Sequence, residues 1–375
     1  MTLPLTLAGI TPQWLSAALA GQCPGVQVSG IVVDDANSGT TGRALLSLQY
    51  AGAVQGPPRL FVKLPPDDER QRAFVAENGM GRREALFYRV LSAEVPVRVP
   101  RCYFADSNAA GDRYIMLLEN LEDAGCSFRN SSSRYSMDYI REVLAAFARL
   151  HGMFWDSPRF TDDLAWVEPP GFHPMAPRLV ERAMEQYANS MPPVFRAMGD
   201  FYLEHAAAIH RLWTEGTPTL VHGDVHDGNL FYDESYEGGT TGGRTPGGRT
   251  PGGRTPGGRT PGFLDWAIVG RTSCMRDVAY FMTGSLRPED RSSHQAELLE
   301  FYYRELSRNT AARVDTASLW TQYQWHAAYV WLAAVTTLAM GSEWQPVNYV
   351  MRTMERLNRA VEDCDSRASL QRFLS

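Results

Sequence analysis

The sequence predicts an α+β fold with two lobes, a small β-rich N-terminal lobe and a larger helical C-terminal lobe. The chain has 375 residues, which suits two or three domains or one large two-lobed unit. Apolar residues make up 44% of the chain and charged residues 21%, which is enough for a sizeable core. Short apolar runs typical of strands occur in the first third of the chain, and apolar residues at helical spacing occur in the rest. We place the boundary between lobes 1–119 and 120–375.

The first third begins with a short helix and continues in strands. Thr11 and Pro12 form a typical helix start ahead of a short amphipathic segment. A second helix is expected over 82–92, where apolar residues recur at helical spacing. Residues 34–42 are rich in Asp, Asn, Ser and Gly and predict the turn between the first two strands. Glycine, proline and polar residues bound the five apolar runs that read as strands: 26–33, 45–50, 59–64, 102–104 and 114–118.

The remainder of the chain has the apolar spacing of helices. Residues 137–155 carry five apolar side chains at helical spacing: Ile140, Val143, Leu144, Phe147 and Leu150. Similar patterns predict further helices at 175–190, 195–213, 276–285, 289–308, 316–340 and 346–362.

Composition excludes several classes of partner. The net charge is −6 and the pI is about 5.8, whereas nucleic-acid binding needs a basic face. Five dispersed cysteines without a CxxC pair indicate reduced thiols and no zinc site. The N-terminus lacks the positive region of a signal peptide, and the apolar run 326–340 is shorter than a membrane span. We therefore expect a cytoplasmic protein without nucleic-acid or membrane partners; the oligomeric state stays open.

One segment is of low complexity. Gly-Gly-Arg-Thr-Pro occurs four times in tandem over residues 242–261. Glycine and proline at this density do not sustain a helix or a central strand, so we expect a solvated loop. Its arginines are five residues apart without aromatic residues between them, which argues against an RNA-binding tract.

The strongest chemical signal is the run LVHGDVHDGNLFY at 220–232. An apolar strand enters a polar loop that carries Asp224 and Asn229, and a second apolar strand leaves it. A later apolar segment ends at Asp265. Two carboxylates and an amide oxygen suit a hard cation such as Mg²⁺. A carboxylate that does not bind the metal can orient or deprotonate a hydroxyl group.

HGD-x4-N, followed by an Asp after an apolar strand, resembles the phosphotransferase loop of the aminoglycoside phosphotransferase and choline kinase superfamily. FLDW at 263–266 and RDVAYF at 276–281 are most similar to its ecdysteroid-kinase-like branch. The resemblance covers about 26–340. It implies a protein-kinase-like fold, ATP and Mg²⁺ as cofactors, and transfer of the γ-phosphate to a hydroxyl group of a small molecule.

The resemblance also implies roles for single residues. Asp224 would accept or orient the proton of the substrate hydroxyl. Asn229 and Asp265 would hold Mg²⁺ between the phosphates. Lys63, at the end of an apolar strand, would contact the α- and β-phosphates. Glu84, in the following helix, would pair with Lys63.

Two further segments would contact the nucleotide. The turn 38–42 would cover the phosphates with backbone N–H groups, which involves Ser38, Gly39, Thr40 and Thr41. It departs from the glycine-rich loop of protein kinases. Residues 119–121 resemble the hinge that reads adenine through backbone groups, so Glu119 and Leu121 are further candidates.

Several of these residues have plainer interpretations. A lysine before two prolines can simply be solvated, and Glu69 and Glu77 compete with Glu84 as the partner of Lys63. We expect His222 to support the loop by packing and Asp277 to cap a helix or brace the loop. Whether His226 and Asp227 face the acceptor or solvent stays open.

The segment between the two proposed metal ligands contains the repeat. Asp265 follows Asn229 by 36 residues, and removal of the four repeats shortens this distance to 16, about the length of a β-hairpin. The repeat is therefore expected to be inserted into the turn between the two strands that carry the ligands.

The predicted helix at 319–332 suggests the acceptor. It contains three tryptophans and two tyrosines but no acid, whereas polycationic aminoglycosides need carboxylates. If this helix lines the pocket, an uncharged or apolar alcohol fits best. The alternatives are an aminoglycoside-type phosphotransferase, a non-catalytic nucleotide-binding sensor, and an interaction protein that acts through the repeat.

Overall fold

The computed structural model describes residues 1–39, 41–128, 135–233, 260–342 and 347–374. The chain divides into two compact units. Unit 1 comprises Met1–Arg129 and Gly228–Val269, and unit 2 comprises Asn130–Asp227 and Gly270–Ser375. Compared with the predicted boundary after residue 119, unit 1 continues further and takes in a second, later segment. It does so because strands from both segments pair in one sheet.

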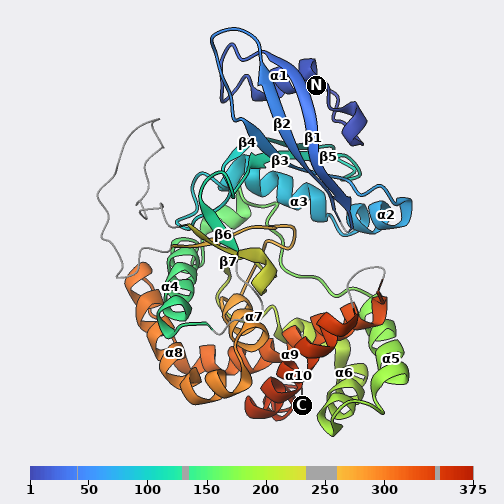
Figure 1. Cartoon of the computed structure of the whole chain (residues 1–375). Coiled ribbons are helices and arrows are strands. Elements are labelled where there is room, and N and C mark those ends of the chain that lie inside the picture. Colours follow the sequence, from blue (N-terminus) through green and yellow to red (C-terminus); the bar gives the residue numbers. More distant parts are fainter. Residues whose placement is uncertain (40, 129–134, 234–259, 343–346, 375) are drawn as a thin grey trace. The chain divides into compact units, whose positions relative to one another are not determined.

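Unit 1 is built on a five-stranded antiparallel sheet (Figure 1). Its order is β1-β2-β3-β5-β4. The 3₁₀ turn Leu7–Gly9 and helix α1 (Pro12–Leu19) precede it, and the Thr11 side chain accepts a hydrogen bond from Trp14 N, as the predicted helix start requires. The strands are β1 (Val28–Ser38), β2 (Gly42–Tyr50), β3 (Arg59–Leu64), β4 (Cys102–Ser107) and β5 (Tyr114–Glu119).

The turn predicted over 34–42 is much shorter in the structure. Strand β1 continues to Ser38, which pairs with Gly42 of β2, so residues 34–38 belong to the strand. The polar residues at the end of β1 are exposed. Backbone pairing with β2 does not depend on their side chains, and it overrides their weak strand propensity.

Two helices follow β3 where the sequence predicted one over 82–92. Helix α2 (Glu69–Glu77) was not predicted, and α3 (Met80–Leu86) continues as a π-helical turn at Phe87–Leu91. Gly79 separates α2 from α3 with a φ of 62°, in the left-handed region that glycine adopts without strain.

A small second sheet explains the later segment of unit 1. Its order is β6-β8-β9, with strands β6 (Cys126–Phe128), β8 (Leu230–Asp233) and β9 (Thr260–Phe263), all antiparallel. Strands β8 and β9 pair as expected for strands that flank an insertion. The end of the repeat differs from the predicted loop, because Thr260 and Pro261 belong to β9. Strand β9 is an edge strand, where proline is tolerated; the rest of the repeat lies outside the described residues.

Unit 2 is mostly helical. A two-stranded sheet of β7 (Thr219–Val221) and β10 (Gly270–Thr272) accompanies the helices. Helix α9 packs against α5, α7, α10 and α11. Figure 1 shows α9 among the helices of this unit. Its side chains, including Trp331 and Val335, belong to the core of the unit. The helices are α4 (Met137–Met153), α5 (Met175–Tyr187), α6 (Pro193–Leu212), α7 (Met275–Ser285), α8 (Pro288–Asn309), α9 (Thr316–Met340), α10 (Val347–Asp363) and α11 (Ser366–Gln371), with 3₁₀ turns at Pro158–Thr161 and Asp227–Asn229.

The helices predicted in the second part of the chain are therefore present, with bounds shifted by a few residues. Across the described ranges, no helix combines the length and the apolar character that crossing a membrane requires.

Candidate active site

A buried charge cluster forms in unit 1 around Lys63. Strand β3 lies between β2 and β5, and Lys63 on this strand is only 4% exposed. Its Nζ lies 2.7 and 2.6 Å from the two carboxylate oxygens of Glu84, and 3.1 Å from Oδ1 of Asp265. The pairing predicted between Lys63 and Glu84 is thus present, and Asp265 joins it.

The three charges shift one another's pKa values. Burial would lower the pKa of Lys63, but the carboxylates of Asp265 and Glu84 outweigh it and raise this pKa, so the ammonium persists. Burial raises the pKa of Glu84 to about 7, with Asp265 adding to the rise and Lys63 opposing it. One cation faces two carboxylates, so the cluster has a local excess of negative charge that a further cation would neutralise.

Asn229 and Asp265 lie at neighbouring strand ends in unit 1. Leu230 of β8 pairs with Phe263 of β9, and Leu264 N donates to the carbonyl oxygen of Asn229 at 3.1 Å. Asp265 follows with a φ of 64°, an uncommon conformation for a residue other than glycine. Stacking of Trp266 on Phe87, with 3.9 Å between ring centroids, anchors the residue that comes next.

The donor set of these two residues fits Mg²⁺. Asn229 offers an amide oxygen and Asp265 a carboxylate, and both belong to the oxygen ligands that this ion prefers. No cluster of three or more His, Cys, Asp or Glu side chains with metal-binding geometry occurs in the part of the chain that the structure describes. Two protein ligands suit an ion that takes its remaining ligands from phosphates and water.

In unit 2, a buried aspartate holds the loop that carries Asp224. Asp277 is fully buried, and its carboxylate accepts hydrogen bonds from His222 N at 2.7 Å and Gly223 N at 2.8 Å. His151 Nε2 lies 3.2 Å from the same carboxylate. Burial alone would raise the pKa of Asp277, but the hydrogen bond and charge of His151, the charge of His222 and the hydrogen bond from Gly223 N together outweigh it and lower this pKa. Asp277 therefore braces the loop.

We expect Asp277→Asn to lower kcat at least tenfold for a reaction that takes place at the loop of Asp224, because loop misplacement disturbs the reacting atoms. It should also lower the free energy of unfolding, since the buried N–H groups of His222 and Gly223 lose a charged acceptor. Asp277 has a lowered pKa in the folded protein, so its contribution is present above about pH 4 and is lost as pH falls. Steady-state kinetics and urea unfolding at several pH values check this; wild-type kcat in the variant would contradict it.

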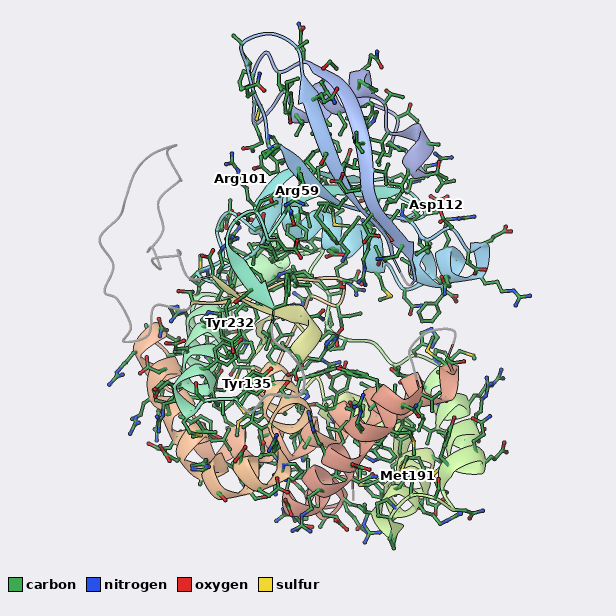
Figure 2. All side chains as sticks on the ribbon, viewed as in Figure 1. Arg59, Arg101, Asp112, Tyr135, Met191 and Tyr232 are labelled. Atoms are coloured by element: carbon green, nitrogen blue, oxygen red, sulfur yellow. The ribbon has the colours of Figure 1, made fainter. Side chains whose placement is uncertain are left out.

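The side chain of Asp224 faces a cavity of about 240 Å³ in unit 2, together with His226 and Asp227. The Tyr280 hydroxyl is hydrogen-bonded to Asp224, and His226 Nε2 lies 3.8 Å from Asp224 Oδ2. The hydroxyl of Tyr135, which Figure 2 labels just before α4, donates to Asp227. Both residues left open by the sequence thus line the cavity.

The predicted nucleotide turn and hinge have their own partners within unit 1. Ser38 Oγ accepts a hydrogen bond from Asp67 N at 3.0 Å, and Gly39 N donates to the carbonyl oxygen of Thr41. Thr40 lies outside the described residues.

At the hinge, the Glu119 carboxylate accepts from Arg98 Nη2 at 3.0 Å and from Arg101 N at 2.8 Å. The carbonyl oxygen of Leu121 accepts from Cys126 N. The nucleotide contacts assigned to these two residues stay predictions.

The structure therefore brings Lys63, Glu84 and Asp265 together, with Asn229 beside Asp265. Asp224 belongs to unit 2, and the chain passes from one unit to the other between Asp227 and Gly228. The wall of the cavity contains polar residues of α7 and α10 that were not predicted as site residues. Their only sequence signal is a polar side chain within a helix: Tyr280, Tyr349, Arg352 and Arg356.

The acceptor prediction from the helix at 319–332 rested on its aromatic side chains. Tyr323, Trp325 and Trp331 are buried in the core, and Trp320 is partly exposed. Tyr329 packs its ring against the Arg276 guanidinium at 3.4 Å. None of these five lines the cavity, to which α9 contributes small side chains further along.

The sequence of the chain matches the profiles of two related families of known proteins. Residues 49–242 match the profile of the phosphotransferase enzyme family, and residues 261–314 match that of the ecdysteroid kinase-like family. A search of curated protein sequences gives no match. The wild-type aminoglycoside 2′-phosphotransferase-IIIa, solved as a GDP complex, has a TM-score of 0.50 at 13% identity, over 95% of this chain and 99% of that one.

A mutant of that enzyme, also with GDP, has a TM-score of 0.50 at 12% identity, covering 93% of this chain and 97% of its own. A choline kinase from Cryptosporidium parvum has a TM-score of 0.47 at 11% identity, over 94% and 95% of the two chains. The predicted α+β, protein-kinase-like fold is confirmed. Because the first profile spans more than half of the sequence, the chain belongs to the phosphotransferase enzyme family.

Proposed function

We propose that the protein is an ATP- and Mg²⁺-dependent kinase that transfers the γ-phosphate to a hydroxyl group of a small molecule. The observation that carries this proposal is the buried cluster of Lys63, Glu84 and Asp265. A lysine held between two carboxylates, with an amide oxygen beside them, is suited to binding phosphates together with a divalent cation.

On the nucleotide side, Glu84 positions Lys63, and the Lys63 ammonium binds the α- and β-phosphates. Asn229 and Asp265 hold the Mg²⁺ ion, which neutralises negative charge on the phosphates when it is bound. The turn at 38–42 covers the phosphates with backbone N–H groups, and Glu119 and Leu121 belong to the segment that receives the adenine ring.

On the acceptor side, Asp224 orients the substrate hydroxyl and takes up its proton. The hydroxyl oxygen forms a bond to the γ-phosphorus, and the bond from that phosphorus to the oxygen bridging to the β-phosphate breaks. ADP and a phosphate monoester are the products. The loop bonds of Asp277 support this role, because they hold the backbone just before Asp224.

The test is ADP release from Mg-ATP across hydroxyl compounds of different charge, including aminoglycosides, choline, sugars and sterols, with Asp224→Asn as the blank. We expect at least one acceptor to stimulate ADP release from the wild type and not from the blank. Equal rates in both proteins would contradict the role of Asp224.

A nucleotide-binding sensor is the second candidate. It would be stabilised by Mg-ATP without releasing ADP in the presence of any acceptor. The presence of Lys63, Asp224, Asn229 and Asp265 together favours catalysis, because a sensor does not need a base. Aminoglycosides and sterols in the acceptor panel test the aminoglycoside-type and the apolar alternatives.

The repeat offers a direct test of the interaction-protein alternative. Because Thr260 and Pro261 form part of β9, the deletion should remove only residues 242–259. We expect this variant to keep Mg-ATP-induced thermal stabilisation and ADP release within about twofold, since changes in loop length cost little. Thermal shift and coupled ADP assays measure this. Loss of nucleotide binding in a folded variant would assign the repeat a functional role.

We also infer a reducing, cytoplasmic compartment. All five cysteines are free thiols, three of them buried. This agrees with a protein that does not depend on disulfides for stability.

A further inference from the structure

The cavity beside Asp224 is small and belongs wholly to unit 2. Its volume is about 240 Å³, below the range of about 300–1,000 Å³ that holds drug-sized ligands. Its wall combines the loop that carries Asp224, helix α7, the second half of α9 and helix α10. An occupant of this cavity is therefore a small molecule, or the small end of a larger one, next to the proposed base.

Two arginines give one side of this cavity its charge. Arg352 and Arg356 are four residues apart in α10, so they project from one face of the helix. Arg356 Nη1 donates to the carbonyl oxygen of Gly284, another wall residue, at 3.2 Å. Among the described residues, neither arginine forms an ion pair with a carboxylate. Arg359 of the same helix instead pairs with Asp363 at 3.0 Å.

The two acids of the cavity are already engaged. Asp224 is hydrogen-bonded to the Tyr280 hydroxyl and has the proposed role of base. Asp227 accepts a hydrogen bond from Tyr135. A polycationic acceptor would need several carboxylates aimed at its ammonium groups. The cavity instead has two arginines without a carboxylate partner in the described part of the chain, and this favours a ligand of the opposite charge.

The position of Tyr349 shows that the acids and the arginines lie around the same cavity. Burial raises the pKa of its hydroxyl, and the charge of Asp227 adds to this effect. Arg356 and Arg352 lower the same pKa. Tyr349 also lines the cavity, so both sets of charges lie within electrostatic range of a bound molecule.

We propose that the acceptor is a small hydroxy compound that also carries an oxyanion, a carboxylate or a phosphate, which Arg352 and Arg356 bind while the hydroxyl group faces Asp224. This assignment rests on the proposed kinase function and names its substrate class. The planar guanidinium group matches the two oxygens of a carboxylate or phosphate. The apolar part of the acceptor contacts the small side chains of α9, such as Ala333 and Ala334.

The test compares four probes built on one carbon skeleton: glycerol, glycerate, glycerol phosphate and aminopropanediol. Titration calorimetry of the full chain measures the affinity of each. We expect glycerate or glycerol phosphate to bind at least about tenfold more tightly than the neutral and cationic probes. The tighter of the two anions distinguishes a carboxylate from a phosphate. Absence of binding by both anions would overturn the proposal.

Matched variants assign the effect to the arginines. Arg352→Gln and Arg356→Gln should each weaken the binding of the anionic probe about tenfold to a hundredfold, as expected for a lost hydrogen bond to a charged group. Arg359→Gln on the same helix is the control and should keep wild-type affinity. Circular dichroism checks that the variants are folded. Wild-type affinity in both cavity variants would contradict the proposal.

ADP release separates this inference from the proposed function. Turnover of glycerol or aminopropanediol that requires Asp224, without a preference for the acids, would overturn the oxyanion site and leave the kinase in place. Arginine-dependent anion binding without Asp224-dependent ADP release from any acceptor would support the oxyanion site but overturn the kinase function.

Discussion

Asp224→Asn is expected to lower kcat for phosphate transfer about 100- to 10,000-fold, the range that a positioned general base contributes. An asparagine has nearly the same shape as aspartate, so the cavity wall and the bond to Tyr280 should remain. Its amide cannot accept the proton that leaves the hydroxyl oxygen. The loss should therefore fall on kcat, with little change in the KM for ATP.

Single-turnover and steady-state measurements of ADP release check this prediction. The control is Asp138→Asn, which removes an exposed acid from the first turn of α4 in the same unit. It should keep kcat within about twofold, because surface substitutions rarely matter. A loss in both variants would indicate an indirect effect. Wild-type kcat in Asp224→Asn would show that transfer does not need this carboxylate.

The sequence predicted the pairing of Lys63 with Glu84 in unit 1, but it did not predict that Lys63 is buried. A lysine followed by two prolines has the pattern of a strand end in solvent. Lys63 is buried because it lies on the face of β3 opposite Leu60 and Val62, where Glu84 of α3 contacts it. The continuous apolar run around it is the sequence signal for a strand that is buried on both faces. Burial itself depends on what packs against each face, and this is not visible in one segment.

The choice of Glu84 over Glu69 and Glu77 shows what helical patterns can and cannot decide. Both rivals lie in α2, which the sequence did not predict, and the left-handed turn at Gly79 separates them from α3. Glu84 is 1% exposed in α3 and reaches Lys63. The spacing of apolar residues indicated the right helix. The break before it depends on a single backbone conformation.

The cavity residues were the least predictable part of the site. Helix α10 was expected from its apolar pattern, but it carries several arginines in successive helical turns. Arg359 pairs within its own helix, whereas Arg352 and Arg356 face the cavity. Only the packing of α10 against α7 and α9 decides which face is covered. In the same way, three of the aromatic side chains of α9, Tyr323, Trp325 and Trp331, are buried in the core, the usual place for such residues.

Asp265→Asn should reduce kcat about 100- to 1,000-fold, because it removes the only carboxylate of the proposed metal site. It should also raise the Mg²⁺ concentration needed for half-maximal activity, since an amide oxygen carries no full charge. The cluster itself should survive. Lys63 keeps its two short contacts to Glu84, and the carboxylate that helps to raise the pKa of Glu84 is gone.

The Mg²⁺ dependence of thermal stabilisation by ATP tests this prediction without relying on turnover. In the wild type, Mg²⁺ should increase the stabilisation by ATP; in Asp265→Asn the increase should be much smaller. Asp123→Asn is the matched control in unit 1, because Asp123 is a partly exposed acid paired with Arg59. Exposed ion pairs contribute at most about 1 kcal/mol, so the control should keep both stability and Mg²⁺ response. An unchanged Mg²⁺ response in Asp265→Asn would show that Asp265 does not bind the ion. Asp265 supplies the only carboxylate of the proposed metal site, so its loss must be felt if the proposal is right.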